Sequence, residues 1–337
     1  LRIFYQRLWD LAFGQPDPEH HEVILLVSLL YYSCAMLLGR GLRHCVRRLI
    51  TPTLGKSVAS CLLDLVTTFQ VCACSLENGV IRKHYGMPAY LCTLLLLGVW
   101  HSGTLGDACG NPCGSWRQFV LGKARLSGTL IRMSLQMLAG AMAYRYARCC
   151  WWRLGLSSEH EMRYRITGCS SDLAVPVGAG FSIEAFATGL DLLVGLCVFS
   201  SGLRWERFQP LIKVLISTLL TYCGLHLTGM YVNPANATAQ TFGCEGSQPW
   251  EHVTVYWLGP LAGVTGAVQA HRRWLGGHPA VKLDSVAADV AGAALRSSDR
   301  LVRRRLYSDN NSTDCLDAGV AAEMSDLIET LKGQKQL

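Results

Sequence analysis

The sequence predicts an all-helical membrane protein, with six transmembrane helices and two re-entrant half-helices in an inverted repeat and an extra N-terminal hydrophobic helix. Three observations predict this fold. Half of the 337 residues are apolar and 16% are charged, which is too apolar for an ordinary soluble enzyme. Apolar runs long enough to enter a bilayer recur along the chain. Asn-Pro followed by a small residue occurs twice, each time after such a run, which predicts two half-helices that meet inside a membrane.

The composition also argues against other classes of protein. The net charge is +7, and in a membrane protein such an excess is better explained by basic loops than by nucleic-acid binding. The 15 cysteines lie mostly inside apolar runs, where cysteine acts as a small buried hydrophobe. No Cys-x-x-Cys pair has a matching second pair, so we expect no zinc site and no cofactor.

Seven apolar segments are candidates for membrane helices. The first, Val23 to Leu38, is short for a span but could cross with flanking residues that reach the interface. A cleaved signal peptide is the alternative, although no basic region or small-residue cleavage site frames the run. The other six segments are residues 57–76, 87–105, 128–147, 181–203, 210–227 and 253–270.

The basic residues indicate the orientation of these spans. Arg40, Arg43, Arg47, Arg48 and Lys56 follow the first run with no acidic residue among them, which is typical of a cytosolic loop. The loop 230–252 has no Lys or Arg and is expected on the opposite side. The loop 148–180 carries arginines, but long loops cross regardless of charge. The C-terminal tail is then cytosolic, and residues 316–331 show the spacing of an amphipathic helix.

An internal repeat organises the central part of the chain. Three pairs of anchors recur in the same order at offsets of 120 to 123 residues. They are Asp64-x-x-x-Thr68 with Glu184-x-x-x-Thr188, Asn111-Pro112 with Asn233-Pro234, and Leu138-Ala139-Gly140 with Leu261-Ala262-Gly263. Because each half holds three spans, the halves have opposite orientation. We expect an N-terminal segment with the extra helix (1–56), a first repeat (57–148), a connecting loop (149–181), a second repeat (182–275) and a tail (276–337).

The residues of the two motifs, Asn111-Pro112-Cys113 and Asn233-Pro234-Ala235, suit a helix that begins inside the bilayer. Proline is favoured at the first helical position, since it has no N–H that would need a partner. The asparagine before it can cap the helix, and its amide can also donate a hydrogen bond outward. Two such helices meeting head to head place two donors and two positive dipole ends together. That arrangement orders water or another neutral solute and repels cations, protons included.

These residues resemble the aquaporin (major intrinsic protein) family. The resemblance covers about residues 57–275, and its other matches are the acidic residue four positions before a threonine in each half, Gln136, Gly140 and Gly259-Pro260-x-x-Gly263. The first motif ends in Cys113, and residues 67–74 and 255–260 are similar to the unorthodox superaquaporin group, the aquaporin-11 and aquaporin-12 type. The extra N-terminal run fits the same group.

The resemblance implies a fold, an assembly and a location. Family members place six tilted helices and two half-helices around one pore, with four subunits together, so we expect a homotetramer in a lipid bilayer and no nucleic-acid partner. Asp64 and Glu184 would be buried acids that accept hydrogen bonds from the backbone of the re-entrant loops, with Gln136 as further buried support. The group suggests an intracellular membrane, of the endoplasmic reticulum or of a vesicle.

The resemblance also implies which residues form the narrowest part of the pore. Water-selective family members carry an arginine directly after the second motif, whereas this chain has Asn236. Thr221, Met230 and either Tyr90 or Leu91 would complete the constriction. With no positive charge there, we expect water and small neutral solutes such as glycerol or hydrogen peroxide to pass. Proton exclusion would then rest on the half-helix dipoles alone.

Several alternatives stay open. Cys113 either faces the pore or is a tolerated small residue. Cys244 lies where the superaquaporin group places a cysteine linked to assembly, and the alternative is a lone thiol in a loop. The alternative function is a poorly conducting or non-conducting membrane scaffold on the same fold. An intramembrane enzyme using His101, Asp107 and Cys113 would leave the repeat unexplained, so we expect no catalytic residues.

Overall fold

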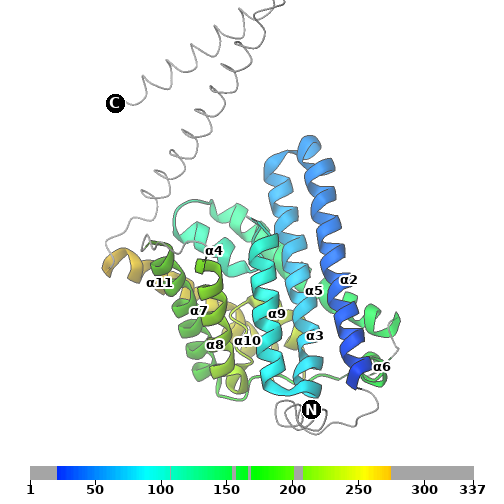
Figure 1. The fold of residues 1–337 in the computed structure, drawn as a ribbon. Coiled ribbons are helices and arrows are strands. Elements are labelled where there is room, and N and C mark those ends of the chain that lie inside the picture. Colours follow the sequence, from blue (N-terminus) through cyan, green and yellow to red (C-terminus); the bar gives the residue numbers. More distant parts are fainter. Residues whose placement is uncertain (1–20, 107, 154–156, 166–167, 201–207, 275–337) are drawn as a thin grey trace, which may run out of the picture. The chain divides into compact units, whose positions relative to one another are not determined.

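The computed structural model describes residues 21–106, 108–153, 157–165, 168–200 and 208–274. Within these ranges the chain is helical and forms no β-strand, and a single parallel bridge pairs Ser170 with Glu245. The expected C-terminal amphipathic helix and Asp107 lie outside the described residues. The all-helical expectation is therefore met in the part of the chain that the structure describes (Figure 1).

The helices fall into long and short ones. The long helices are α2 (His21–Cys45), α3 (Thr51–Thr104), α5 (Leu126–Arg153), α7 (Val177–Ser200), α8 (Gln209–Thr228) and α11 (Gly259–Trp274). The short ones are α4 (Pro112–Val120), α6 (Ser158–Arg165), α9 (Pro234–Thr241) and α10 (Pro249–His252). Two π-helical turns, Val46–Ile50 and Val253–Leu258, join α2 to α3 and α10 to α11. Both short helices that follow an Asn-Pro motif, α4 and α9, begin at its proline.

α3 contains two of the expected spans. Its backbone leaves the helical conformation at Gly55 and Gly86, where φ is 83° and 75°. Glycine adopts positive φ without a steric penalty, so Gly86 separates the span at 57–76 from the span at 87–105. α2 has 25 residues, or roughly 37 Å at 1.5 Å per residue, which is longer than its apolar run suggests.

By length and composition, three stretches of helix among the described residues could cross a membrane. They are the continuous run His21–Thr104, Val177–Cys197 in α7 and Pro210–Thr228 in α8. The helices at the other two expected spans, α5 and α11, are not among these three. The chain is thus a helical protein with several apolar helices of membrane length.

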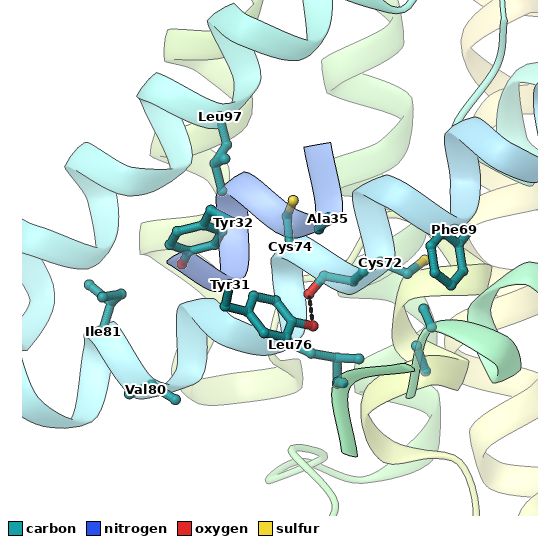
Figure 2. Packing of buried hydrophobic residues seen from close by; sticks show 14 of the residues in the cluster. Tyr31, Tyr32, Ala35, Phe69, Cys72, Cys74, Leu76, Val80, Ile81 and Leu97 are labelled. Carbon is teal, nitrogen blue, oxygen red and sulfur yellow. Dashed lines mark hydrogen bonds between the residues drawn. The ribbon is translucent and has the colours of Figure 1, made fainter. Parts of the chain in front are cut away.

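The largest buried cluster lies where α2 packs on α3 (Figures 1 and 2). Tyr31 of α2 is fully buried, and its hydroxyl donates a 2.9 Å hydrogen bond to the carbonyl of Ala73 in α3. Small side chains such as Ala35 and Cys72 let the helices approach closely, as is common for helices in lipid. The extra N-terminal helix is therefore an integral part of the packed core.

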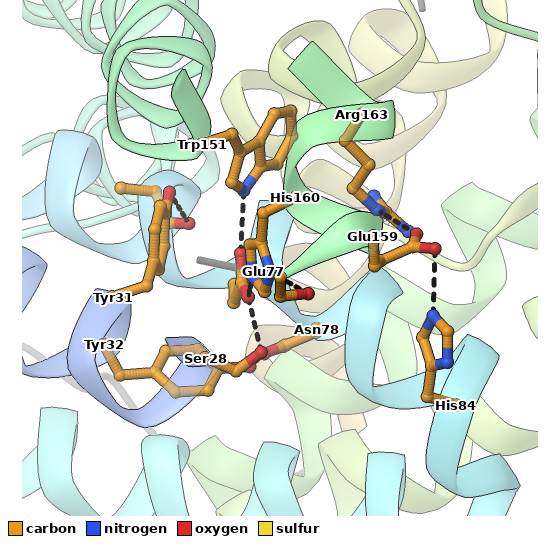
Figure 3. Close-up of polar contacts among 12 residues, drawn as sticks. Ser28, Tyr31, Tyr32, Glu77, Asn78, His84, Trp151, Glu159, His160 and Arg163 are labelled. Carbon is orange, nitrogen blue, oxygen red and sulfur yellow. Dashed lines mark hydrogen bonds and ion pairs between the residues drawn. The ribbon is translucent and has the colours of Figure 1, made fainter. Parts of the chain in front are cut away.

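α6, in the loop between the expected halves, packs on α5 and is bonded to α3 through two buried acids (Figure 3). Glu77 of α3 is fully buried and accepts hydrogen bonds from Ser28 (2.6 Å) and Trp151 (2.9 Å), and its Oε1 lies 2.8 Å from His160 Nε2. Glu77 thus ties α2, α3, α5 and α6 together.

Glu159 of α6 makes the second attachment. Its carboxylate contacts Lys83 at 2.6 Å, His84 at 2.9 Å and Arg163 at 2.9 Å. Burial alone would raise the pKa of Glu159, but the hydrogen bonds from these three side chains outweigh it and lower the pKa from 4.5 to about 2. The carboxylate is therefore held in its charged form.

Candidate functional site

The two Asn-Pro motifs cap the helices that follow them. Asn111 Oδ1 accepts a 2.9 Å hydrogen bond from the backbone N–H of Cys113, at the start of α4. Asn233 Oδ1 accepts from the N–H groups of Ala235 (3.1 Å) and Asn236 (3.4 Å), at the start of α9. Both asparagines have the extended backbone of a helix cap, and proline takes the first helical position.

The side-chain amides of the same two asparagines join the motifs to each other. Asn111 Nδ2 donates a 2.9 Å hydrogen bond to the carbonyl of Val232, the residue before the second motif. Asn233 Nδ2 donates a 3.1 Å bond to the carbonyl of Gly110, the residue before the first. Each amide has two N–H donors, so this exchange uses one donor of each and leaves one for another acceptor.

Glu184 of α7 fixes the loop before the second motif. The carboxylate is fully buried and accepts from the backbone N–H of Tyr231 (3.1 Å) and of Val232 (2.9 Å), and from the Thr228 hydroxyl (2.7 Å). The residues on either side of Tyr231 have positive φ, 46° at Met230 and 45° at Val232. Such values are outliers for a β-branched residue, so Glu184 holds a strained backbone.

Asp64 of α3 fixes the loop before the first motif with fewer backbone bonds. Its Oδ1 accepts from the N–H of Cys109 at 2.8 Å, and its Oδ2 pairs with Arg132 of α5, also at 2.8 Å. Gln136, fully buried on α5, donates to the carbonyl of Cys109 at 2.8 Å and accepts from Ser115 of α4 at 3.0 Å. Asp64 therefore reaches the loop although it is one methylene shorter than glutamate.

A cavity of about 400 Å³ runs past both motifs. Its lining includes the two motif asparagines, Asn111 and Asn233. It also includes four of the five residues that the sequence suggested for the constriction, namely Tyr90, Thr221, Met230 and Asn236. Leu91 and Cys113, both described, are not part of this lining. The structure thus brings Tyr90 rather than Leu91 to the cavity, and Cys113 is buried away from it.

Comparison with known proteins places this arrangement in a family. No protein-family model matches the chain. It is 30% identical to human aquaporin-11 over 207 residues, 60% of this chain and 74% of that protein. The chain belongs to the aquaporin family, in its aquaporin-11 and aquaporin-12 group. It is also 26% identical to aquaporin-11 of Milnesium tardigradum over 239 residues (71% and 84%), and 34% identical to human putative aquaporin-12B over 198 residues (58% and 65%).

A solved structure supports the same fold. An aquaglyceroporin from Plasmodium falciparum superimposes with a TM-score of 0.52 at 16% sequence identity, and the match covers 68% of this chain and all of that one. At this identity the likeness concerns the fold. Family and fold together make this protein a helical membrane protein of a channel family.

Asn236 of this aquaporin is not an isolated side chain on the cavity wall. Its Oδ1 accepts a 3.2 Å hydrogen bond from Gln240, one turn further along α9, and Gln240 also donates to Ser75 of α3 at 2.8 Å. Ser75 and Gln240 line the same cavity. Beside Asn236 the cavity wall is therefore a chain of hydrogen-bonded polar side chains that joins α9 to α3.

Cys244 is paired with Cys169 in a disulfide, so it is not a lone thiol. Backbone hydrogen bonds between Ser171 and Glu245 (2.7 Å) and between Glu245 and Cys169 (2.9 Å) run beside it. The disulfide and these hydrogen bonds together connect the segment before α7 to the segment after α9. It brings Asp172 to the cavity, where its carboxylate accepts from the Tyr231 hydroxyl.

Sequence reasoning missed four charged residues that line the cavity, namely Arg82 on α3, Asp172 before α7, Asp191 on α7 and Lys213 on α8. A signal was present for Arg82. The cavity-lining residues of α3 include Val71, Cys74, Asn78 and Arg82, which follow the spacing of one helical face. Arg132, the partner of Asp64, was also missed, because a pairing across two helices leaves no local pattern.

Proposed function

We propose that this aquaporin is a transmembrane channel for the passive flow of water and of small neutral solutes, glycerol and hydrogen peroxide among them. The observation that carries the proposal is that one cavity is lined by the asparagines of both motifs. Each of these asparagines is oriented by a cap bond and a cross bond. The cavity would be the pore.

The chemistry of the cavity centre suits a neutral solute with a lone pair. The second N–H of each asparagine amide can donate to a water or hydroxyl oxygen, and two fixed donors turn that oxygen toward the centre. α4 and α9 begin at the same place, so their N-terminal dipole ends add positive potential there. The site therefore favours an oxygen acceptor and disfavours a cation.

The proposed constriction consists of Tyr90, Thr221, Met230 and Asn236, which line the cavity together. None of these four side chains carries a formal charge, and the Thr221 hydroxyl and Asn236 amide can hydrogen-bond to a polyol. Met230 and Tyr90 offer apolar or aromatic surface to its carbon atoms. Such a mixed lining supports glycerol as well as water.

The proposed architecture has six membrane spans and two half-helices, α4 and α9, in two inverted repeats over 57–148 and 182–275. The segments 1–56, 149–181 and 276–337 would be the extra helix with its basic loop, the connecting loop and a cytosolic tail. We further propose a homotetramer in an intracellular membrane. The supports are the recurring anchors and the helix starts at both motifs.

Stopped-flow swelling of proteoliposomes tests the function. The purified full-length chain should raise water permeability above that of protein-free liposomes, and glycerol and hydrogen peroxide should enter faster as well. A channel that passes water and excludes glycerol would contradict the wide constriction. Swelling rates equal to those of empty liposomes would leave the non-conducting scaffold as the function.

A further inference from the structure

We propose that the end of α5 and α6 together bind the phosphate group of an anionic phospholipid. The site consists of three arginines and two aromatic residues, namely Arg145, Arg148, Trp152, Arg153 and Tyr164. This inference goes beyond the proposed channel and rests on one part of it, the architecture in which α5 spans the membrane. It gives a role to arginines at the start of the loop 148–180, which the orientation of the spans leaves unexplained.

Two contacts between α5 and α3 show at which end of the molecule the site lies. Near the start of α5, Arg132 pairs with Asp64 of α3 at 2.8 Å, and near its end Trp151 donates to Glu77 of α3 at 2.9 Å. α5 and the first part of α3 therefore run side by side in the same direction. Because α3 begins within the basic stretch 40–56, α5 ends on the opposite side, which the sequence predicts to be non-cytosolic.

One face of α5 changes from apolar to basic and aromatic near the end of the helix. Leu138 and Met142 are exposed on this face. Arg145 and Trp152, which are also exposed, continue it about one and three turns further along. The helix from Leu126 to Arg145 is roughly 29 Å long at 1.5 Å per residue, close to the hydrocarbon core of a bilayer at about 30 Å. The basic and aromatic end of α5 would therefore lie among the lipid headgroups.

The aromatic rings and two of the guanidinium groups form one continuous stack. The guanidinium carbon of Arg153 lies 4.5 Å from the centre of the Trp152 ring. That ring stacks on Tyr164 of α6, with 6.2 Å between the ring centres and 28° between the planes. The guanidinium carbon of Arg148 lies 5.5 Å from the Tyr164 ring, and its Nη2 donates a 3.0 Å hydrogen bond to the Tyr164 carbonyl. The contact between α5 and α6 thus holds both guanidinium groups in place.

The three arginines of the site form no ion pair in the part of the chain that the structure describes. The two acids on α6 are engaged with other bases: Glu159 contacts Lys83 and Arg163, and Glu161 pairs with Arg165. Arginine and lysine are normally scarce on the non-cytosolic side of a membrane protein. Three arginines without an acid at this end therefore point to an anionic partner outside the chain.

The chemistry of the surface favours a phospholipid over a free anion. A guanidinium presents coplanar N–H donors that match the oxygens of a phosphate group. Arg148 uses one of its five N–H donors on Tyr164, which leaves the others for a phosphate. Tryptophan and tyrosine are enriched at headgroup level, and the apolar face at Leu138 and Met142 can contact acyl chains. A lipid satisfies both parts of this surface, whereas inorganic phosphate satisfies the arginines alone.

The test measures lipid binding by the purified full-length protein in a neutral detergent. Native mass spectrometry follows the retention of added phosphatidylglycerol, which is anionic, and of phosphatidylcholine, which is zwitterionic. The wild type should prefer phosphatidylglycerol. Replacing Arg145, Arg148 and Arg153 together by glutamine should weaken the tightest phosphatidylglycerol binding about 100-fold, at about fivefold for each arginine near an anionic headgroup. Phosphatidylcholine binding should stay unchanged, and equal affinity of the wild type for the two lipids would overturn the inference.

Two single substitutions separate position from net charge. Arg148→Gln should weaken phosphatidylglycerol binding about fivefold. Arg165→Gln is the matched control, since it removes the same charge from an exposed arginine that is paired with Glu161, and it should change binding less than about twofold. Equal weakening by both would overturn the inference. Displacement of the lipid by an equal concentration of inorganic phosphate would also overturn it, because the site would then be a simple anion site.

A second measurement needs no substituted protein, in case the variants fail to fold. A phosphatidylglycerol with a photoreactive group near its headgroup should label the peptide that contains residues 144–165 of the wild type. Labelling confined to other peptides, such as the basic stretch 40–56, would overturn the inference.

Swelling of phosphatidylcholine liposomes keeps this inference separate from the channel function. Selective phosphatidylglycerol binding in a protein that gives no flux would support the lipid site and overturn the channel. Water flux in a protein without that selectivity would overturn the lipid site and leave the channel standing.

Discussion

Glu184 and Asp64 stand at matching positions of the two halves, but they hold their loops in different ways. Glu184 accepts two backbone N–H bonds and a hydroxyl bond, and no cation among the described residues pairs with it. It stabilises a backbone with positive φ at Met230 and Val232. Asp64 accepts one backbone N–H bond and relies on Arg132 for its second oxygen. The longer acid thus fixes more of the backbone than the shorter one.

This difference matches what each loop contributes to the cavity. The second loop and the start of α9 contribute residues 229–233 and Asn236 to the cavity lining. Of the described residues of the first loop and α4, Asn111 lines the cavity. The loop that shapes the passage is therefore the one held by more backbone bonds. The two similar motifs therefore have different structural roles: the second loop lines the passage, and the first loop supports the start of α4.

The largest expected effect comes from removing the two acids in turn. Glu184→Ala leaves two buried N–H groups unpaired in a strained loop, and at roughly 1–3 kcal/mol for each unsatisfied group it should cost about 3–5 kcal/mol. Asp64→Ala leaves one N–H unpaired and frees Arg132, which is one-third exposed, so it should cost less. Thermal unfolding of the purified proteins in detergent measures both. A larger loss in Asp64→Ala would contradict the comparison.

The second-largest effect is expected from a change at the contact between the two halves, where α5 meets the start of α9. Gly140 of α5 lies against the carbonyl of Ala235, and a Cβ at position 140 would clash with that backbone oxygen. Gly140→Ala should therefore cost about 1–3 kcal/mol through overpacking and should lower water flux, because it displaces the start of α9. Gly128→Ala is the control on the same helix, since a Cβ there meets nothing within 4 Å. Equal behaviour of the two variants would show that the close approach is not required.

A smaller effect should follow from pH, through the attachment of α6. The pKa of Glu159 is lowered from 4.5 to about 2. Above pH 4.5 the Glu159 carboxylate is charged in both the folded and the unfolded chain, and its ion pairs contribute fully to the stability of the fold. Below 4.5 the unfolded chain binds the proton first, so stability should fall until the pH reaches about 2. Unfolding measured across this window should show a steeper slope in the wild type than in Glu159→Gln, and equal slopes would contradict the pairing.

The smallest effect is expected from making the first motif like the second. Cys113→Ala turns Asn-Pro-Cys into the Asn-Pro-Ala of the other half. Cys113 is 6% exposed and does not line the cavity, so the variant should keep water and glycerol fluxes within about twofold and lose at most about 1 kcal/mol of stability. A clear change in the ratio of glycerol to water flux would mean that Cys113 faces the solute.

The sequence predicted much of the fold because its signals are local or periodic. Apolar runs mark long helices, and a proline after an asparagine marks the start of α4 and of α9. The resemblance also led to Asp64, Glu184 and Gln136, which the structure places on the backbone of the two loops or on the residues that support them.

The sequence could not give the pairings between distant segments. The bond from Asp64 to Arg132, the disulfide from Cys169 to Cys244 and the arrival of Asp172 at the cavity all depend on how loops fold back. The choice between Tyr90 and Leu91 depended on a one-residue gap between the halves, and such a shift moves a side chain by about 100° around a helix. Arg82 was missed because the helical face that it shares with Val71, Cys74 and Asn78 is recognised as a cavity wall only once the helices are packed.

The central claim is that water and neutral solutes pass through the cavity between the two motifs. A steric block tests it most directly. Thr221→Trp places a large side chain inside the cavity, while Leu219→Trp adds similar bulk two residues earlier on α8, at a position that is 60% exposed. Stopped-flow swelling should show water and glycerol fluxes near the protein-free level for Thr221→Trp and near the wild-type level for Leu219→Trp. Wild-type flux through Thr221→Trp in a folded protein would contradict the claim.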